Sequence, residues 1–326
     1  MATPEDEGRH EPGAEQLWNE SWYFDFAAAD GSLGGYVRLG LYPNLGVAWY
    51  WAYLVREGEP LLAVKHHEAS LPTSKTLEVR EEGLWATQTC ETPHDHWTIG
   101  LESFAVALDE PGEAYADDLR GDKVALGFDL EWEATAPVYD YPMVTRYEQS
   151  CRVSGEILVD TETITFDGWG QRDHSWGIRD HGRCPLWIWF QIQLPDGMLG
   201  VWHWELENGA RVYTDGCWAG ADGSDPIPVV DFHHEMAWVG APYGDHGETV
   251  TGLAGQSTFT LVGGRRIVVD AEGTFDRPYE PFHRGGLSQM RVRTDDGRTG
   301  TAIYEITGAR HHRYFPDTTV PGPLPS

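Results

Sequence analysis

Cysteines and basic residues are scarce in this sequence. Its 326 residues include four cysteines, Cys90, Cys151, Cys184 and Cys217, and no two of them form a Cys-x-x-Cys pair. This spacing excludes a zinc ribbon and a dithiol redox motif, so we expect reduced, buried thiols. Lysine and arginine total 23 against 52 aspartates and glutamates, a net charge of −29. Such a charge repels phosphate backbones and anionic headgroups, and we expect no nucleic-acid or membrane-surface partner.

Long apolar runs are absent as well. No stretch approaches the roughly 20 apolar residues that a membrane-spanning helix requires, and residues 1–16 lack the apolar segment of a signal peptide. We therefore expect a cytoplasmic protein without a membrane span. Residues 1–16 have almost nothing to bury, which predicts a disordered lead-in. The acidic excess is explained either by solubility or by recognition of a basic partner.

The common motifs of nucleotide binding and nucleophilic catalysis are also missing. There is no P-loop, no Rossmann glycine fingerprint before a helix and no G-x-S-x-G elbow. Any chemistry must therefore use other residues.

What the sequence does contain is β-type alternation. From residue 17 onward, short runs such as Trp22–Phe26, Gly35–Leu41 and Val47–Val55 alternate apolar and polar residues and end at Gly, Asp, Asn or Pro. This pattern predicts an all-β fold of antiparallel barrels or sandwiches with few short helices. The proline-rich residues 316–326 predict an extended tail.

A repeated motif indicates two domains. The pattern D-G-x-L-G occurs at residues 30–34 and again at 196–200, about half the chain later, each time after an aromatic strand. Two similar β domains that open with the same hairpin explain this spacing, although a shared turn preference is the alternative. We expect the domains at residues 17–167 and 168–315.

The boundary falls on an unusual segment, residues 168–180, which reads G-W-G-Q-R-D-H-S-W-G-I-R-D. Dense charge beside aromatic rings is typical either of a structural knot of ion pairs or of a pocket wall that carries acid chemistry. A domain junction is also a favoured place for ligand sites. The residues expected to brace the junction are Arg172, Arg179 and Asp180.

His174 is the first candidate for proton transfer in this segment, as a donor or shuttle. Asp173 is a second, because a carboxyl group held among rings keeps its proton. A pairing with arginine would instead make Asp173 structural. Trp176 lies two residues after His174, so both side chains point into one cavity if the segment is extended.

Histidine spacing gives a weaker metal hypothesis. His94 and His96 face the same way on a strand, and His203 or His174 could complete a set of ligands. No third ligand stands at a diagnostic spacing, so we do not predict a metal site.

Aromatic residues indicate the character of the substrate. The chain has 15 Trp, 14 Tyr and 11 Phe, more than a compact core needs. Ring faces attract cations, and a cavity that they line suits an apolar ligand that reacts through a carbocation. Ordinary core packing is the alternative for each ring. The candidate substrate-binding residues are Trp22, Tyr23, Trp176, Trp189, Trp202 and Trp204.

Three short motifs resemble one family. Trp18–Phe24 (W-N-E-S-W-Y-F), Gly170–Gly177 (G-Q-R-D-H-S-W-G) and Gly300–Glu305 (G-T-A-I-Y-E) are similar to segments of AttH-like and carotenoid 1,2-hydratase-like proteins. The resemblance implies two tandem lipocalin-like barrels, an apolar ligand, often an isoprenoid or polyketide, and catalysis without a cofactor. Activities in the family include hydration of an alkene, dehydration, isomerisation and cyclisation, pericyclic reactions included.

The resemblance also implies catalytic residues. Carotenoid hydratases use a His-x-Trp pair, which His174 and Trp176 match, and a Tyr-x-Asp pair, for which Tyr213 and Asp215 are the candidates. We therefore expect an enzyme that protonates an alkene of an isoprenoid-type substrate. A pericyclase that only folds a polyene, and a carrier without catalysis, are the alternatives.

Overall fold

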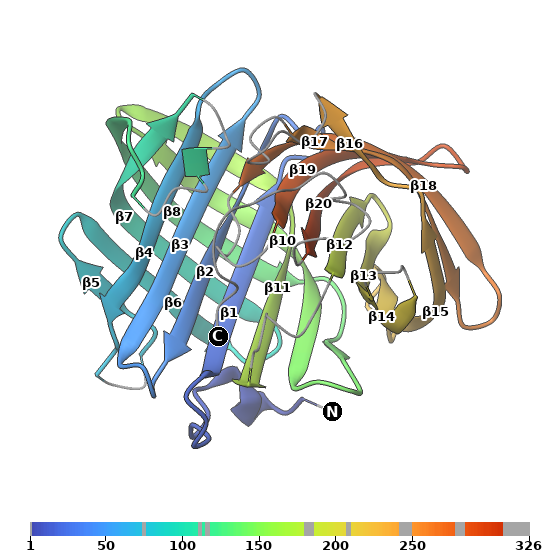
Figure 1. The fold of residues 1–326 in the computed structure, drawn as a ribbon, viewed down its shortest axis with the longest axis horizontal. Helices are drawn as coiled ribbons and strands as arrows, with labels where there is room; N and C mark the ends of the chain where they lie inside the picture. Colours follow the sequence, from blue (N-terminus) through green and yellow to red (C-terminus); the bar gives the residue numbers. More distant parts are fainter. Residues whose placement is uncertain are drawn as a thin grey trace. The chain divides into compact units, whose positions relative to one another are not determined.

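The computed structural model describes residues 2–73, 76–109, 113–114, 118–178, 186–206, 210–240, 250–277 and 284–308 (Figure 1). The described residues form twenty strands and one short 3-10 helix, η1 (Pro4–Glu7). The predicted all-β fold is confirmed. Within this part of the chain, no helix has the length and apolarity needed to cross a membrane. Two large sheets lie at the centres of two compact units.

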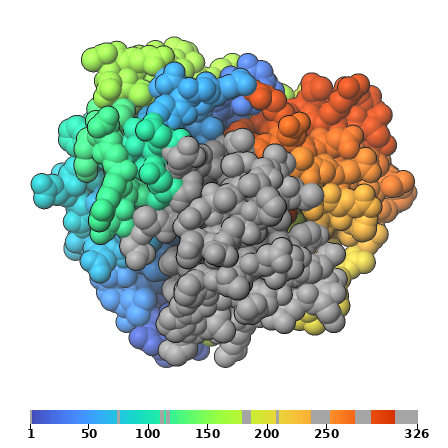
Figure 2. Space-filling view, turned by 45° about the horizontal axis from the view of Figure 1, so that its top comes forward, coloured from blue at the N-terminus to red at the C-terminus, as the bar shows by residue number. Residues whose placement is uncertain are grey.

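The first sheet is an antiparallel barrel. Its order is β4-β3-β2-β1-β11-β10-β8-β7, and β7 pairs back with β4, which closes a ring of eight described strands. Figure 2 shows blue atoms of the early part of the chain beside blue-green atoms from later in the same unit, as the pairing of β4 with β7 requires. Strands β6 and β5 continue from β7, and β9 pairs with β10. The strands are β1 (Trp18–Ala27), β2 (Leu33–Tyr42), β3 (Val47–Arg56), β4 (Leu61–Ser70), β5 (Val79–Glu81), β6 (Leu84–Thr92), β7 (His96–Leu108), β8 (Asp122–Ala134), β9 (Tyr139–Asp140), β10 (Arg146–Val159) and β11 (Glu162–Ile178).

The second sheet closes in the same way. Its order is β15-β14-β13-β12-β20-β19-β18-β17, with β17 paired back to β15 and β16 added beside β17. The strands are β12 (Leu186–Leu194), β13 (Gly197–Glu205), β14 (Arg211–Gly220), β15 (Ile227–His234), β16 (Ala237–Gly240), β17 (Val250–Leu261), β18 (Arg266–Arg277), β19 (Arg284–Thr294) and β20 (Thr299–Gly308).

Alternation along the strands builds a separate core in each barrel. On β1, Trp22, Phe24 and Phe26 are fully buried and share one face. Phe24 contacts the rings of Trp97 and Trp132 across the first barrel, with ring centroids 5.3 and 5.5 Å away. In the second barrel, the core groups residues such as Phe190 on β12 and Tyr304 on β20, which stack at 3.6 Å.

The repeated D-G-x-L-G motif occupies matching places. Its first copy forms the β1–β2 hairpin, and its second copy forms the β12–β13 hairpin. In both sheets, the strand before the motif also pairs with the last long strand of the same sheet, β11 or β20.

The division of the chain differs from the expectation at residue 168. Strand β11 runs without a break from Glu162 to Ile178 and pairs along its length with β10 and β1. Residues 168–178 therefore end the first barrel rather than begin the second. The reason is the continuous antiparallel register, which the sequence motif does not reveal. Arg179, Asp180, Cys184 and the tail at 316–326 lie outside the described residues.

The N-terminal stretch also differs from the expectation of disorder. Residues 2–16 are described, and Asn44 donates hydrogen bonds to the carbonyl oxygens of Gly13 and Glu15 at 2.8 Å each. Trp22 Nε1 lies 3.4 Å from the carbonyl oxygen of Glu7. Polar groups of this stretch are bonded to the first barrel, which offsets its lack of apolar residues.

Gly170 lies on β11 where this strand comes close to β1. A Cβ on Gly170 would lie 2.1 Å from the carbonyl oxygen of Asp25 and 2.7 Å from a methyl group of Val153. We expect Gly170→Ala to lower the free energy of unfolding by roughly 1–3 kcal/mol, because overpacking forces the strands apart. Gly8→Ala is the control, since its Cβ would come no nearer than 3.4 Å to the carbonyl oxygen of Glu5. Equal denaturant midpoints for the two variants would contradict the close approach of β11 to β1 at Gly170.

Candidate functional site

A cluster of polar side chains lies on the inward face of the first barrel, where β1, β11 and β10 are neighbours. The register places His174 on β11 opposite both Trp22 on β1 and Tyr147 on β10. Because alternate residues of a strand share a face, Glu20 and Arg172 point the same way as their neighbours Trp22 and His174. All five residues are buried.

The N-terminal segment supplies two further members, Glu7 and His10. Glu7 ends η1 and is buried, and its carboxylate forms a bidentate ion pair with Arg172. Arg172 Nη1 lies 3.0 Å from Glu7 Oε2, and Arg172 Nη2 lies 2.5 Å from Oε1. Arg172 also donates to Gln149 Oε1, at 3.1 Å from Nε and 2.6 Å from Nη2. Arg172, which was predicted to be structural, is therefore hydrogen-bonded to both Glu7 and Gln149.

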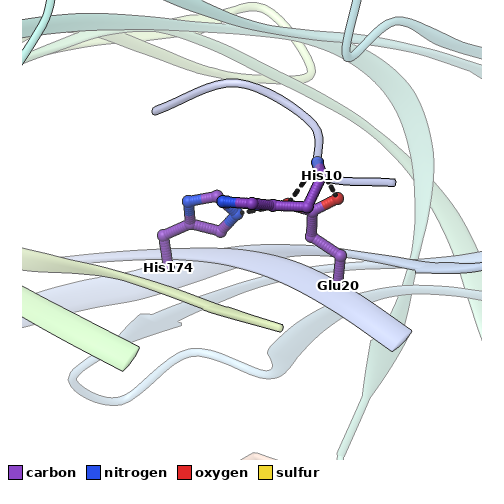
Figure 3. A group of neighbouring side chains, drawn as sticks. All are labelled: His10, Glu20 and His174. Carbon is purple, nitrogen blue, oxygen red and sulfur yellow. Dashed lines mark hydrogen bonds and ion pairs between the residues drawn. The ribbon is translucent and has the colours of Figure 1, made fainter. Parts of the chain in front are cut away.

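Glu20 joins two histidines (Figure 3). His10 Nδ1 lies 2.6 Å from Glu20 Oε1, and His174 Nε2 lies 2.9 Å from the same oxygen. The backbone N–H of His10 also donates to Glu20, at 3.1 Å from Oε1 and 3.0 Å from Oε2. On its other side, His10 Nε2 lies 3.1 Å from Asp6 Oδ1. Asp6 and His10 are partly exposed, whereas Glu20 and His174 are fully enclosed.

Tyr147 connects the two parts of the cluster. Its hydroxyl donates to Glu7 Oε2 at 2.8 Å and lies 3.3 Å from His174 Nδ1. Polar contacts thus run from Arg172 through Glu7, Tyr147, His174 and Glu20 to His10. Because Tyr147 gives its one hydroxyl hydrogen to Glu7, its 3.3 Å contact with His174 Nδ1 is a hydrogen bond only when Nδ1 carries a hydrogen.

The two histidines have opposite pKa shifts. Partial burial works to lower the pKa of His10, but the hydrogen bonds and charges of Glu20 and Asp6 outweigh it and raise that pKa. For His174 burial dominates, and its pKa is lowered despite the hydrogen bond to Glu20. Burial would raise the pKa of Glu20, but its histidine partners hold that pKa below the usual range. His10 is therefore the more readily protonated of the two histidines, and His174 the less.

Tryptophan rings cover both histidines. The ring of His10 stacks on Trp176 with centroids 3.9 Å apart and planes 13° apart. Trp22 stacks on His174 at 4.4 Å and 18°. An aromatic face stabilises a nearby cation by about 0.5–2 kcal/mol, so Trp176 favours protonated His10.

Three of the predicted residues thus lie together, since the ring of His174 contacts both Trp22 and Trp176, but Asp173 does not join them. Asp173 follows the alternation onto the opposite face of β11, where Arg146 Nη2 lies 3.0 Å from Asp173 Oδ2. Asp173 therefore forms the structural ion pair that was the alternative to a catalytic role, and its partner is Arg146 on β10. Tyr23 also lies on the opposite face of its strand, in ring contact with Tyr36 at 5.2 Å.

The other predicted residues belong to the second unit. Tyr213 donates a hydrogen bond to Asp215 Oδ2 at 3.1 Å, and its ring contacts Trp202 at 5.9 Å and Trp204 at 5.3 Å. Trp189 is buried on β12. The two junction residues Arg179 and Asp180 lie outside the described residues.

Four members of the cluster were missed from the sequence: Glu7, His10, Glu20 and Tyr147. The sequence could have predicted Glu20 as a member, because Glu20 lies two residues before Trp22 on a predicted strand and shares its face. The sequence offers no reason to expect Glu7 and His10 there, since residues 1–16 are too polar to predict an ordered segment.

The weak metal hypothesis paired His94 and His96, and among the described residues neither lies with the other candidates His174 and His203. His94 Nε2 lies 3.7 Å from Glu7, and His96 Nε2 lies 3.6 Å from Glu131. Within the described residues, ligand atoms of His10, Glu20 and His174 instead lie within 4.8 Å of one another. Two imidazoles and a carboxylate are a donor set that Zn²⁺ or Fe²⁺ accepts.

A cavity of about 320 Å³ lies beside this cluster in the first unit. Glu7 lines the cavity and belongs to the cluster, so it connects the two. His174 is not among the lining residues. Burial raises the pKa of the lining thiol Cys90 to about 11, so this cysteine is not a thiolate nucleophile at neutral pH.

Residues 3–310 match a sequence family described as a domain of unknown function, DUF7064. The chain belongs to this family. No curated protein matches its sequence.

Solved structures show the same fold at low sequence identity. The chain is similar to a protein from Nitrosomonas europaea provisionally assigned as AttH, with a TM-score of 0.62, 14% identity, and coverage of 94% of this chain and 97% of that one. It is also similar to kievitone hydratase from Nectria haematococca, with a TM-score of 0.56, 12% identity and coverage of 90% of both chains. CghA has a TM-score of 0.54 and 13% identity, with 91% of this chain and 89% of that one covered. These likenesses support the predicted lipocalin-like architecture.

The buried ion pair generates a stability prediction. We expect Glu7→Gln to lower the free energy of unfolding by roughly 3–5 kcal/mol, because Arg172 would remain charged and fully buried without its counter-ion. Glu5→Gln, in the same short helix but exposed, is the matched control and should change stability by less than about 0.5 kcal/mol. Urea unfolding measures both, and a Glu7→Gln variant as stable as the control would contradict the role of the pair.

The two histidines should titrate on opposite sides of their ordinary pKa of 6.5. In NMR titrations, assigned with His10→Gln and His174→Gln, we expect His10 above that value and His174 below it. Protonated His10 stabilises the fold fully below pH 6.5, and this contribution is lost as the pH rises through its raised pKa. Glu20→Gln should lower the pKa of His10, whereas the exposed Glu11→Gln should leave it unchanged. A His10 that titrates below 6.5 would contradict the proposed charge of the cluster.

Proposed function

We propose that this protein is an enzyme that protonates an apolar, isoprenoid-type small molecule, with the imidazolium of His10 as the acid. The observation that carries the proposal is the position of His10, partly exposed between two carboxylates and stacked on Trp176. A general acid must hold a proton at the working pH and must be within reach of the substrate. His10 is the member of the cluster that suits both conditions best, because its pKa is raised and its ring is not fully enclosed.

His174 serves as a positioning residue in this scheme. It is 0% exposed and burial lowers its pKa, so it is poorly suited to deliver a proton directly to a substrate. Its Nε2–H donates to Glu20, and Glu20 in turn fixes His10 through Nδ1. The proton that leaves is therefore the one on His10 Nε2, which faces the partly exposed Asp6. After transfer, His10 is a neutral imidazole that keeps its Nδ1–H on Glu20.

The ring of Trp176 gives the scheme its substrate preference. Protonation of an alkene carbon breaks the π bond and leaves a carbocation on the neighbouring carbon, which is costly unless an aromatic face lies nearby. Capture by water then gives an alcohol with loss of a proton. Loss of a proton from an adjacent carbon gives an isomer, and attack by a second alkene gives a ring. The similar fold of kievitone hydratase, and of CghA in a structure with Sch210972, supports a reaction on a small organic molecule.

Deuterium incorporation tests the proposal. Acyclic isoprenoids from geraniol to lycopene would be incubated with the protein in heavy water, and we expect product that carries deuterium at a carbon. His10→Gln should lower turnover by about 10²–10⁴-fold, the usual contribution of a general acid. His174→Gln should lower it less, and His233→Gln, an exposed histidine on β15, should leave it unchanged.

The alternatives predict different results. Turnover of a polyene without deuterium uptake, unaffected by His10→Gln, would show a pericyclase. Binding without turnover of any member of the panel would show a carrier. In the acid mechanism, kcat/KM falls as the pH rises through the raised pKa of His10, because the proton to be delivered is lost.

A further inference from the structure

The cavity of about 320 Å³ has features that the proton-transfer cluster does not explain. Its volume lies at the lower end of the range of small-molecule sites, about 300–1,000 Å³. It lies between β6, the start of β7 and the N-terminal segment. The lining residues include Glu7, Arg9, Leu77, Gln88, Cys90 and Trp97.

Two lining side chains are buried with unmet hydrogen-bonding groups. Gln88 is 4% exposed and Trp97 is 1% exposed. In the described part of the chain, neither the amide oxygen nor the amide nitrogen of Gln88 has a partner, and neither does Trp97 Nε1. A buried polar group left without a partner costs about 1–3 kcal/mol, so three such atoms in one cavity require an explanation.

The backbone places these groups together. Cys90 pairs with Trp97 and Gln88 pairs with Ile99 in the β6–β7 ladder, so Gln88 and Trp97 are diagonal neighbours on one face. Trp97 also contacts Phe24, and Leu77 belongs to the same core. The cavity therefore has apolar walls, and two of its lining residues carry two unpaired nitrogen donors and one unpaired carbonyl acceptor.

The charged groups of the lining already have partners. Glu7 is paired with Arg172, Arg9 Nη1 donates to the carbonyl oxygen of Pro72 at 3.1 Å, and Glu78 is bonded to Arg80. The unmet groups are all neutral. A neutral ligand is therefore favoured over an ion, since burying a further charge would require a new counter-charge.

We propose that this cavity binds a neutral, mostly apolar molecule that carries a carbonyl group next to an N–H or O–H group. The carbonyl oxygen accepts hydrogen bonds from Trp97 Nε1 and the amide nitrogen of Gln88. The neighbouring N–H or O–H donates to the amide oxygen of Gln88. This inference is independent of the proposed function, because its test measures binding rather than turnover and does not involve His10.

A pair of probe molecules with the same shape tests the inference. Benzamide carries a carbonyl beside an N–H group, whereas α-methylstyrene has nearly the same outline without either. Titrations would follow the Trp97 indole N–H by NMR, assigned with Trp97→Phe. We expect benzamide to shift this signal saturably and to bind at least about tenfold more tightly than α-methylstyrene, the factor that a net 1.4 kcal/mol of hydrogen bonding gives.

Substitution of Gln88 is the second part of this binding test. Gln88→Leu should weaken benzamide binding about tenfold and strengthen α-methylstyrene binding, because it turns the polar spot into an apolar one. The same change at exposed Gln256 on β17 is the matched control and should alter neither. Gln88→Leu removes an unpaired buried amide, so its Tm should not fall below that of the parent, and lost binding then cannot reflect unfolding.

The inference is overturned by any of three results. Benzamide could leave the Trp97 signal unmoved, the two probes could bind equally well, or Gln88→Leu and Gln256→Leu could bind benzamide with equal affinity. None of these results bears on deuterium transfer by His10, so the two proposals fail separately.

Discussion

The ion pair between Glu7 and Arg172 is the interaction on which the rest of the site depends. A guanidinium that is fully buried inside a β-barrel needs a buried counter-charge, since an isolated charge there is very costly. The strands of the barrel do not supply it. The N-terminal segment does, and once Glu7 is fixed on Arg172, His10 three residues later reaches Glu20.

This arrangement gives two histidines of one cluster different tasks. Both bind the same oxygen of Glu20, yet only His10 has a second carboxylate and contact with solvent. His174 is enclosed by Trp22, Tyr147 and Glu20, so burial decides its charge. In many enzymes, two side chains of the same type take different roles in acid chemistry near neutral pH because their environments differ.

A similar grouping lies inside the second barrel. His203 Nε2 lies 3.2 Å from Glu205 Oε1, and His234 Nε2 lies 3.6 Å from the same oxygen. His203 Nδ1 is bonded to Thr214 Oγ1 at 2.7 Å. Among the described residues, each barrel thus holds a glutamate between two histidines, and in the first barrel one of the two, His10, comes from outside the strands.

Local patterns in the sequence determined the fold class and part of the site. Alternation and turn residues predicted antiparallel strands, the D-G-x-L-G motif predicted matching hairpins, and the spacing of His174 and Trp176 predicted a shared face, because period two is a local property of a strand. The same alternation puts Asp173 on the face opposite His174. Only the tertiary structure decided that β11 completes the first barrel and that Glu7 and His10 enter the site. Those outcomes depend on strand register and on a buried charge pair 165 residues apart in the chain, and no local pattern encodes either.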